Sequence, residues 1–404
     1  MYSISKRNIT VLFWVNFFGA ISFLQPVLTL FYLENGLSEA NILMILMCWS
    51  GAVLIGEIPA GVFADRFGPK ISFLVGSTIK LISVVVLLLS HDLLLFMLFS
   101  FLNGLSVTFF SGADEALIYE SLKKDNKQSK MDEAMGKIQS AGFISMILAV
   151  LLGSFVAKDL DQQQFQLLIL CSLIAYLIEL ILLFFIHEPD VEITVSEASV
   201  NKVVEGISVI KKAPQLLLMF LNLTLVFIPT VAVFEKFDQP LMTDAGLPVY
   251  LIGPIYAVGA LLAFFSSRNI AFLTKKVSRV ALMYASGFLS AGGLLIAALF
   301  QDTLWLILGV ILFLRWIGAI RYPIYSQLSN DVIPSHVRAT TISLLSILDS
   351  IFDLIVFVSL LLFAVEGVSG ILIGAAVIAL LGSMIPIHNA RVRRGKVAIP
   401  KEFQ

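Results

Sequence analysis

The chain has 404 residues, of which 58% are hydrophobic and only 14% are charged, and its mean hydropathy is +0.95. An ordinary soluble domain is about half apolar and about a quarter charged, so this composition excludes that class and indicates a polytopic membrane protein. The net charge of −1 excludes nothing by itself. Both cysteines, Cys48 and Cys171, stand in apolar runs, so we expect neither a disulfide framework nor a metal site.

Apolar runs long enough to cross a bilayer, about 20 residues each, recur along the whole chain and predict twelve transmembrane helices. The first run follows Lys6 and Arg7, but it is too long for the core of a signal peptide, so we expect it to remain as a membrane anchor. In chain order the runs cover roughly 9–33, 40–62, 70–90, 93–117, 135–157, 165–186, 215–240, 248–267, 280–300, 303–328, 338–363 and 367–388.

The positions of the basic residues predict the topology. Most of the 27 lysine and arginine residues fall in the loops and termini of one side, whereas the loops of the other side contain only Lys158. Cytoplasmic loops carry the excess of positive charge. We therefore expect a multi-pass protein of the inner (cytoplasmic) membrane with both termini in the cytoplasm.

A short motif repeats near the ends of the first and seventh runs. Gln25-Pro26 in "FLQPVLTLFYLENGLS" matches Gln239-Pro240 in "FDQPLMTDAGLP", 214 positions later. The repeat divides the chain into an N-terminal bundle (1–187), a polar connector (188–213) and a C-terminal bundle (214–404), each bundle with six helices. The connector contains "SVNKVVEGISVIKKAP", which predicts an amphipathic helix on the cytoplasmic membrane surface; a plain flexible linker is the alternative. Parallel repeats of this kind are typical of transporters that rock about a central site.

The stretch "GVFADRFGPK" (61–70) places charges and glycines between the second and third runs. It has a glycine, three residues, Asp-Arg, one residue and a second glycine, and then Pro69 before the basic Lys70; the matching positions are Gly61, Asp65, Arg66, Gly68 and Lys70, whereas Pro69 stands where a basic residue is usual. This loop resembles the signature loop of the major facilitator superfamily, and the resemblance extends over the whole chain. It implies an all-α polytopic membrane protein with twelve helices in two pseudo-symmetric six-helix bundles. Within that superfamily the sequence is similar to the bacterial twelve-helix branch of drug and metabolite exporters.

The resemblance also implies a gating network on the cytoplasmic side. Asp65 would cap the N-terminus of the eleventh helix, near 335–338, as a latch between the bundles; the alternative is a solvated, positively charged loop. The fourth run ends in "SGADEALIYESL", and its acidic residues are expected to pair with Arg66 or Lys70. Those acidic residues are Asp114, Glu115 and Glu120.

Ionisable residues in the membrane cost about 2.5–3.5 kcal/mol each at a helix centre, so each is a functional hypothesis. Asp349 and Asp353 are four residues apart and share one face of the eleventh helix. With Arg315 at similar depth on the tenth helix, they predict a charge cluster that faces the central cavity and couples transport to protons. A static ion network that holds these two helices together is the alternative.

The superfamily fold implies that helices 1, 4, 7 and 10 line the substrate cavity. Asn103 stands where many proton-coupled relatives carry an arginine, which weighs against proton antiport. The polar residues that these helices offer as substrate-cavity candidates are Asn16, Gln25, Asn103, Asn222, Glu235 and Gln239.

The sequence contains no Gly-rich nucleotide loop, HExxH, GxSxG or paired CxxC motif, so we do not expect an enzyme. It predicts a secondary active transporter that moves a small amphipathic organic molecule by alternating access, in proton-coupled export. One alternative is a proton symporter or facilitator that imports a metabolite or siderophore, and another is a transport-inactive receptor or scaffold. The expected partners are the substrate, protons and the lipid bilayer, without cofactor, metal or nucleic acid, and the expected state is a monomer.

Cysteine labelling tests the predicted topology. Asn35→Cys and Asp302→Cys should react with an impermeant thiol reagent added to intact cells, because both positions fall in loops on the outer side. Lys127→Cys should react only after the cells are permeabilised. Labelling of Lys127→Cys in intact cells would reverse the assignment.

Overall fold

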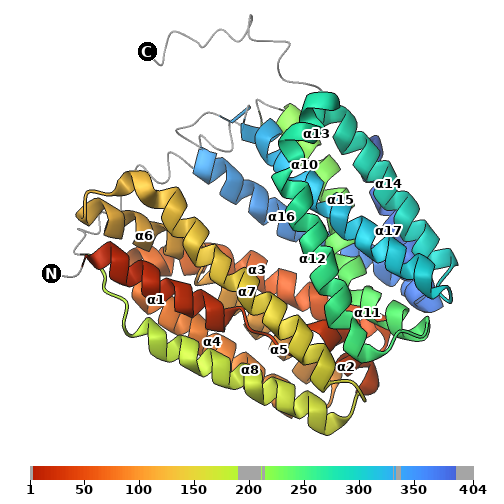
Figure 1. Cartoon of the computed structure of the whole chain (residues 1–404), viewed down its shortest axis with the longest axis horizontal. Helices are drawn as coiled ribbons and strands as arrows, with labels where there is room; N and C mark the ends of the chain where they lie inside the picture. Colours follow the sequence, from red (N-terminus) through yellow and green to blue (C-terminus); the bar gives the residue numbers. More distant parts are fainter. Residues whose placement is uncertain (1–2, 190–210, 212–213, 331, 334–337, 388–404) are drawn as a thin grey trace, which may run out of the picture.

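The computed structural model describes residues 3–189, 211, 214–330, 332–333 and 338–387 (Figure 1). Within these ranges the chain is helical and contains no strand. The N-terminal helices are α1 (Ile4–Gly19), α2 (Leu28–Glu34), α3 (Glu39–Phe67), α4 (Pro69–Leu89), α5 (Leu93–Thr108), α6 (Ala113–Lys124), α7 (Met131–Val156) and α8 (Gln162–Leu183). The C-terminal helices are α10 (Pro214–Phe227), α11 (Phe234–Asp244), α12 (Ile252–Arg268), α13 (Ile270–Lys276), α14 (Arg279–Leu299), α15 (Leu304–Asn330), α16 (Arg338–Leu361) and α17 (Gly367–Met384).

Eleven helical stretches of the described chain are long and apolar enough to cross a membrane, from Glu39–Phe67 to Ala364–Met384. The first expected span is helical too, but it is interrupted: α1 ends at Gly19, a short 3-10 turn covers Gln25–Val27, and α2 completes the segment. This interrupted segment, with 16 residues in α1 and 7 in α2, corresponds to the first of the twelve predicted spans. The all-α, twelve-segment fold predicted from the apolar runs is thereby confirmed.

The helices form two bundles that meet at one end of the molecule (Figure 1). We call the end at which α1 begins the near end, and the end that carries α2 and α11 the far end. The bundles contact each other through α2 with α11, α7 with α12, and α3 with α16. The boundaries predicted for the two bundles remain a prediction, and the amphipathic helix predicted in 188–213 lies outside the described residues.

Glycines allow the bundles to approach closely where α7 crosses its neighbours. A Cβ atom on Gly253 of α12 would lie 2.2 Å from the carbonyl oxygen of Val150 in α7. A Cβ atom on Gly153 would lie 2.0 Å from the carbonyl oxygen of Phe23, in the interruption of the first segment. Since real Cβ atoms do not approach this closely, α7 can contact both neighbours only through glycine.

Gly253→Val should loosen the far end, because the added side chain meets the backbone of α7 and pushes the bundles apart. In a Cys48→Ser, Cys171→Ser background, we expect a cysteine introduced by Gln25→Cys to react faster with an impermeant reagent from the far-end side. Gly292→Val is the matched control, because nothing lies within 4 Å of a Cβ atom at Gly292. Equal reactivity in the two variants would show that this crossing does not keep the far end closed.

Candidate functional site

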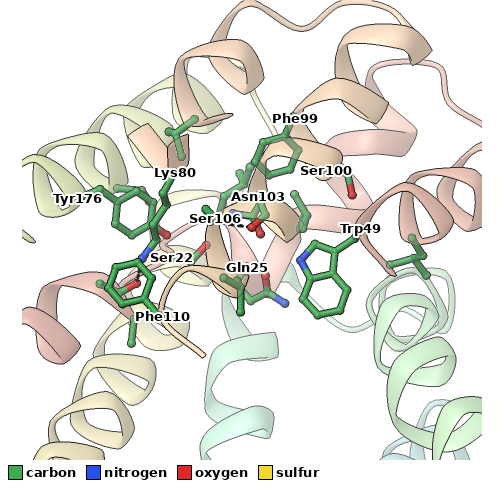
Figure 2. Close-up of a pocket in the computed structure, with 18 of the residues that line it drawn as sticks. Ser22, Gln25, Trp49, Lys80, Phe99, Ser100, Asn103, Ser106, Phe110 and Tyr176 are labelled. Atoms are coloured by element: carbon green, nitrogen blue, oxygen red, sulfur yellow. Dashed lines mark hydrogen bonds between the residues drawn. The ribbon is translucent and has the colours of Figure 1, made fainter. Parts of the chain in front are cut away.

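A cavity of about 840 Å³ lies between the two bundles. Its lining runs from Tyr32 and Ile42, toward the far end, to Asp114 and Met135, toward the near end. Most of the lining comes from the N-terminal bundle, while α11 and α16 contribute from the C-terminal bundle. Figure 2 shows Lys80 and Tyr176 side by side in this pocket, with Trp49 on the opposite side.

Four of the six residues predicted for the cavity line it: Asn16, Gln25, Asn103 and Glu235. Asn222 does not, because it is fully buried inside the C-terminal bundle. Its side-chain amide donates to the carbonyl oxygens of Gly382 and Ile385, and its oxygen accepts from Arg321 at 2.9 Å. Asn222 therefore holds helices together and does not face a substrate.

Gln239, the sixth predicted residue, closes the far end. Its Oε1 atom accepts from the backbone N–H of Thr29 at 2.9 Å, and its Nε2 atom donates to the carbonyl oxygen of Gln25 at 3.1 Å. The two copies of the Gln-Pro repeat thus hydrogen-bond to each other across the bundles. The sequence predicted the repeat, but it carried no signal for this contact.

A buried ion pair supports the interruption of the first segment. The ammonium of Lys80 on α4 lies 3.0 Å from the Glu179 carboxylate on α8, and it donates to the carbonyl oxygen of Gly19 at 2.5 Å. The N–H of Phe23 donates to the Ser172 hydroxyl at 3.0 Å. Backbone groups released by the break are therefore satisfied by side chains, as a membrane interior requires. Glu179 is only 3% exposed.

Lys80 and Glu179 are not among the site residues predicted from the sequence. The available signal was the charge of Lys80 at the middle of an apolar run. Its partner could not be identified from spacing, because the two residues are 99 positions apart in the chain.

Arg315 does not join Asp349 and Asp353, so the predicted three-residue cluster is wrong. Its guanidinium pairs with Glu235 at 3.2 Å and with Asp238 at 3.0 Å, both on α11. Tyr256 of α12 also donates to Asp238, which is fully buried, at 2.5 Å. The reason is helix adjacency, since α15, which carries Arg315, packs against α11 and α12.

Asp349 and Asp353 lie one turn apart on α16, but they face different cavities. Asp353 lines the central cavity and accepts from the Ser50 hydroxyl of α3 at 3.0 Å, a bond that crosses the two bundles. Asp349 lines a separate cavity of about 140 Å³ and accepts from Thr224 at 2.8 Å. Of the two, only Asp353 adjoins the space between the bundles.

Comparisons with known proteins agree with this architecture. A sequence model of the Major Facilitator Superfamily matches residues 9–355. The chain belongs to the major facilitator superfamily. Membership makes it a membrane transporter rather than an enzyme, with a small molecule as its substrate. A search of curated protein sequences finds no match.

Solved structures of major facilitator transporters share the fold at low sequence identity. The nucleoside transporter NupG is 13% identical, with a TM-score of 0.73 over 95% of this chain and 98% of that one. A D-xylose-proton symporter is 15% identical, with a TM-score of 0.70 over 96% and 98%. An inward-facing bacterial homologue of the human lysosomal transporter Spinster is 15% identical, with a TM-score of 0.71 over 95% and 96%. At these identities the likeness concerns the fold alone.

The superfamily signature loop joins α3 to α4, and Gly68 makes the turn between them with φ of +86°. The Lys70 ammonium donates to the carbonyl oxygens of Phe184 and Ile186, at 2.8 and 2.9 Å, after the end of α8. The loop is thereby tied to the sixth membrane helix of its own bundle.

Two of the three acidic residues expected to pair with Arg66 or Lys70 have other partners in the described chain. Glu120 pairs with Lys123 at 3.3 Å, and Asp114 accepts from the N–H of Glu115 at 2.8 Å. The stretch 334–337, which includes most of the predicted partner of Asp65, lies outside the described residues. The Asp65 latch therefore stays a prediction.

Glu179→Gln should strongly destabilise the transporter, because it leaves the Lys80 ammonium buried without a counter-charge. Breaking such a pair costs about 3–5 kcal/mol. The melting temperature of the detergent-solubilised protein should fall, and Lys80→Met combined with Glu179→Gln should recover part of the loss.

The matched control is Glu133→Gln, which removes one partner of the exposed Lys130–Glu133 pair. Exposed pairs are worth about 0–1 kcal/mol, so its melting temperature should hardly change. Equal melting temperatures for Glu179→Gln and Glu133→Gln would show that the buried pair does not stabilise the interrupted segment.

Proposed function

We propose that this chain is a secondary active transporter that exports a small amphipathic organic molecule by alternating access, coupled to protons at Asp353. The observation that carries the proposal is the central cavity: it lies between the bundles, is bridged at the far end by Gln239, and extends toward the near end. With the near end in the cytoplasm, this arrangement is the inward-facing state of a rocking mechanism.

The lining of the cavity supports an amphipathic substrate. Trp49, Phe99 and Phe110 offer aromatic surface, while Gln25 and Asn103 stand among them with side-chain amides (Figure 2). Binding sites for small organic molecules combine an apolar lining with a few placed polar groups in this way. A hydrophilic ion alone would leave most of this surface without a partner.

Asp353 is the coupling residue in this proposal because its single described hydrogen bond spans the bundle interface. Ser50 of α3 donates to it at 3.0 Å. Protonation removes the charge from a carboxylate that lines the cavity, and it weakens the acceptor that holds α3 to α16. Gain and loss of the proton thus favour different arrangements of the bundles, which is what coupling requires.

Asp353→Asn should abolish uptake driven by a pH gradient while leaving substrate exchange intact, because asparagine imitates the protonated acid. Asp349→Asn is the matched control: it alters a carboxylate one turn away that faces the smaller cavity, so it should still accumulate substrate. The measurement uses proteoliposomes and the first compound that the wild type concentrates from a panel of drugs, siderophores and metabolites.

Normal accumulation by Asp353→Asn would exclude this residue as the proton site, and loss in both variants would extend the site to Asp349. The sign of the response reports direction. Substrate movement opposite to the protons supports export, whereas movement with them assigns proton symport and import. A wild type that moves none of the compounds would favour a receptor or scaffold.

A further inference from the structure

The charged groups that line the central cavity are mostly neutralised inside the protein. Lys80 pairs with Glu179 at 3.0 Å, and Glu235 pairs with Arg315 at 3.2 Å. Asp114, toward the near end, stands in the first turn of α6, where the positive end of the helix dipole and the N–H of Glu115 offset its charge. These groups need no charge from a ligand.

Lys236 differs from all of them. Its side chain lines the cavity from α11, yet in the part of the chain that the structure describes no carboxylate lies within ion-pair distance of it. Its two acidic neighbours in sequence, Glu235 and Asp238, share the single positive charge of Arg315, so they offset the charge of Lys236 in part but form no direct ion pair with it. The Lys236 ammonium thus has no direct partner among the described residues, and a carboxylate on a ligand in the cavity would accept its hydrogen bonds.

Asp353 is the complementary case. It lines the same cavity from α16, and its described contact is the neutral Ser50 hydroxyl. The cavity therefore presents one cation and one carboxylate that form no direct ion pair within the described part of the chain. Both come from the C-terminal bundle, while the N-terminal bundle supplies the aromatic wall.

We propose that the substrate is a zwitterion with an apolar body, whose carboxylate binds Lys236 and whose ammonium binds Asp353. This inference rests on the proposed function, because it assigns the substrate class of the same cavity. It also gives the coupling a physical form: an ammonium and a proton compete for one carboxylate, so binding of the substrate from the cytoplasm displaces the proton.

A matched set of tryptophan derivatives tests the proposal, since the apolar body stays constant while the charges change. Tryptophan is zwitterionic, N-acetyltryptophan anionic, tryptophanamide cationic and N-acetyltryptophanamide neutral; the corresponding phenylalanine and leucine compounds extend the set. Binding to the detergent-solubilised full chain is measured by calorimetry and by the rise in melting temperature. We expect at least one zwitterion to bind about tenfold more tightly than each derivative that lacks one charge.

The variants assign each charge to its residue. Lys236→Gln should remove the preference for the zwitterion over the amide, and Lys236→Arg should keep it. Asp353→Asn should remove the preference for the zwitterion over the N-acetyl compound. Lys158→Gln is the control, because Lys158 lies in the loop between α7 and α8, beside Asp159 and outside the cavity. The proposal would be overturned if no zwitterion of the set binds more tightly than its singly charged derivatives. It would also be overturned if Lys236→Gln still binds the zwitterion more tightly than the amide.

Failure of this inference is separable from failure of the proposed function. Transport of neutral or singly charged compounds that is insensitive to Lys236→Gln would reject the zwitterion and retain the transporter. Zwitterion binding that depends on Lys236, without movement of the bound compound in proteoliposomes, would retain the site and reject transport.

Discussion

The structure depends on one constraint: inside a membrane, every backbone N–H and C=O group must find a partner within the protein. The helix of the first segment is interrupted between Gly19 and Gln25. The interruption is stable because Lys80 donates to the freed carbonyl oxygen of Gly19 and the Ser172 hydroxyl accepts from the freed N–H of Phe23. Lys80 is itself neutralised by Glu179. One buried ion pair thus allows a spanning segment to be interrupted beside the cavity.

That interruption places the residues that close the far end. Because α1 stops at Gly19, the chain turns through a 3-10 segment at Gln25–Val27 before α2 begins. The turn brings the carbonyl group of Gln25 and the N–H of Thr29 to the side chain of Gln239. The contact uses side-chain and backbone hydrogen bonds rather than a packed apolar surface, so the proposed rocking of the bundles would break and remake it at moderate cost.

Sequence reasoning identified the parts that depend on local pattern. Apolar runs determined the spans, and the Gln-Pro repeat marked the division of the chain into two halves. Sequence reasoning could not identify ion-pair partners, because these depend on which helices are neighbours in the fold. Arg315 and Asp353 have similar depth in the membrane, and similar depth favours a charge cluster. However, α15, which carries Arg315, packs against α11 and α12, so Arg315 pairs with the acidic residues of α11. Depth follows from position in a span, whereas adjacency follows from the tertiary fold.

The two bundles share a repeat, but they treat the corresponding helix differently. The first segment breaks completely, whereas the seventh keeps its helix through a π turn at Ile228–Val233, which contains Pro229. A π turn holds one more residue than an α turn and rotates everything after it. In α11 the residues after this turn include Glu235 and Asp238, which bind Arg315, and Lys236, which lines the cavity. In the N-terminal bundle, charged and polar side chains thus support the backbone at the break. The charged groups that we propose to bind the ligand lie in the C-terminal bundle.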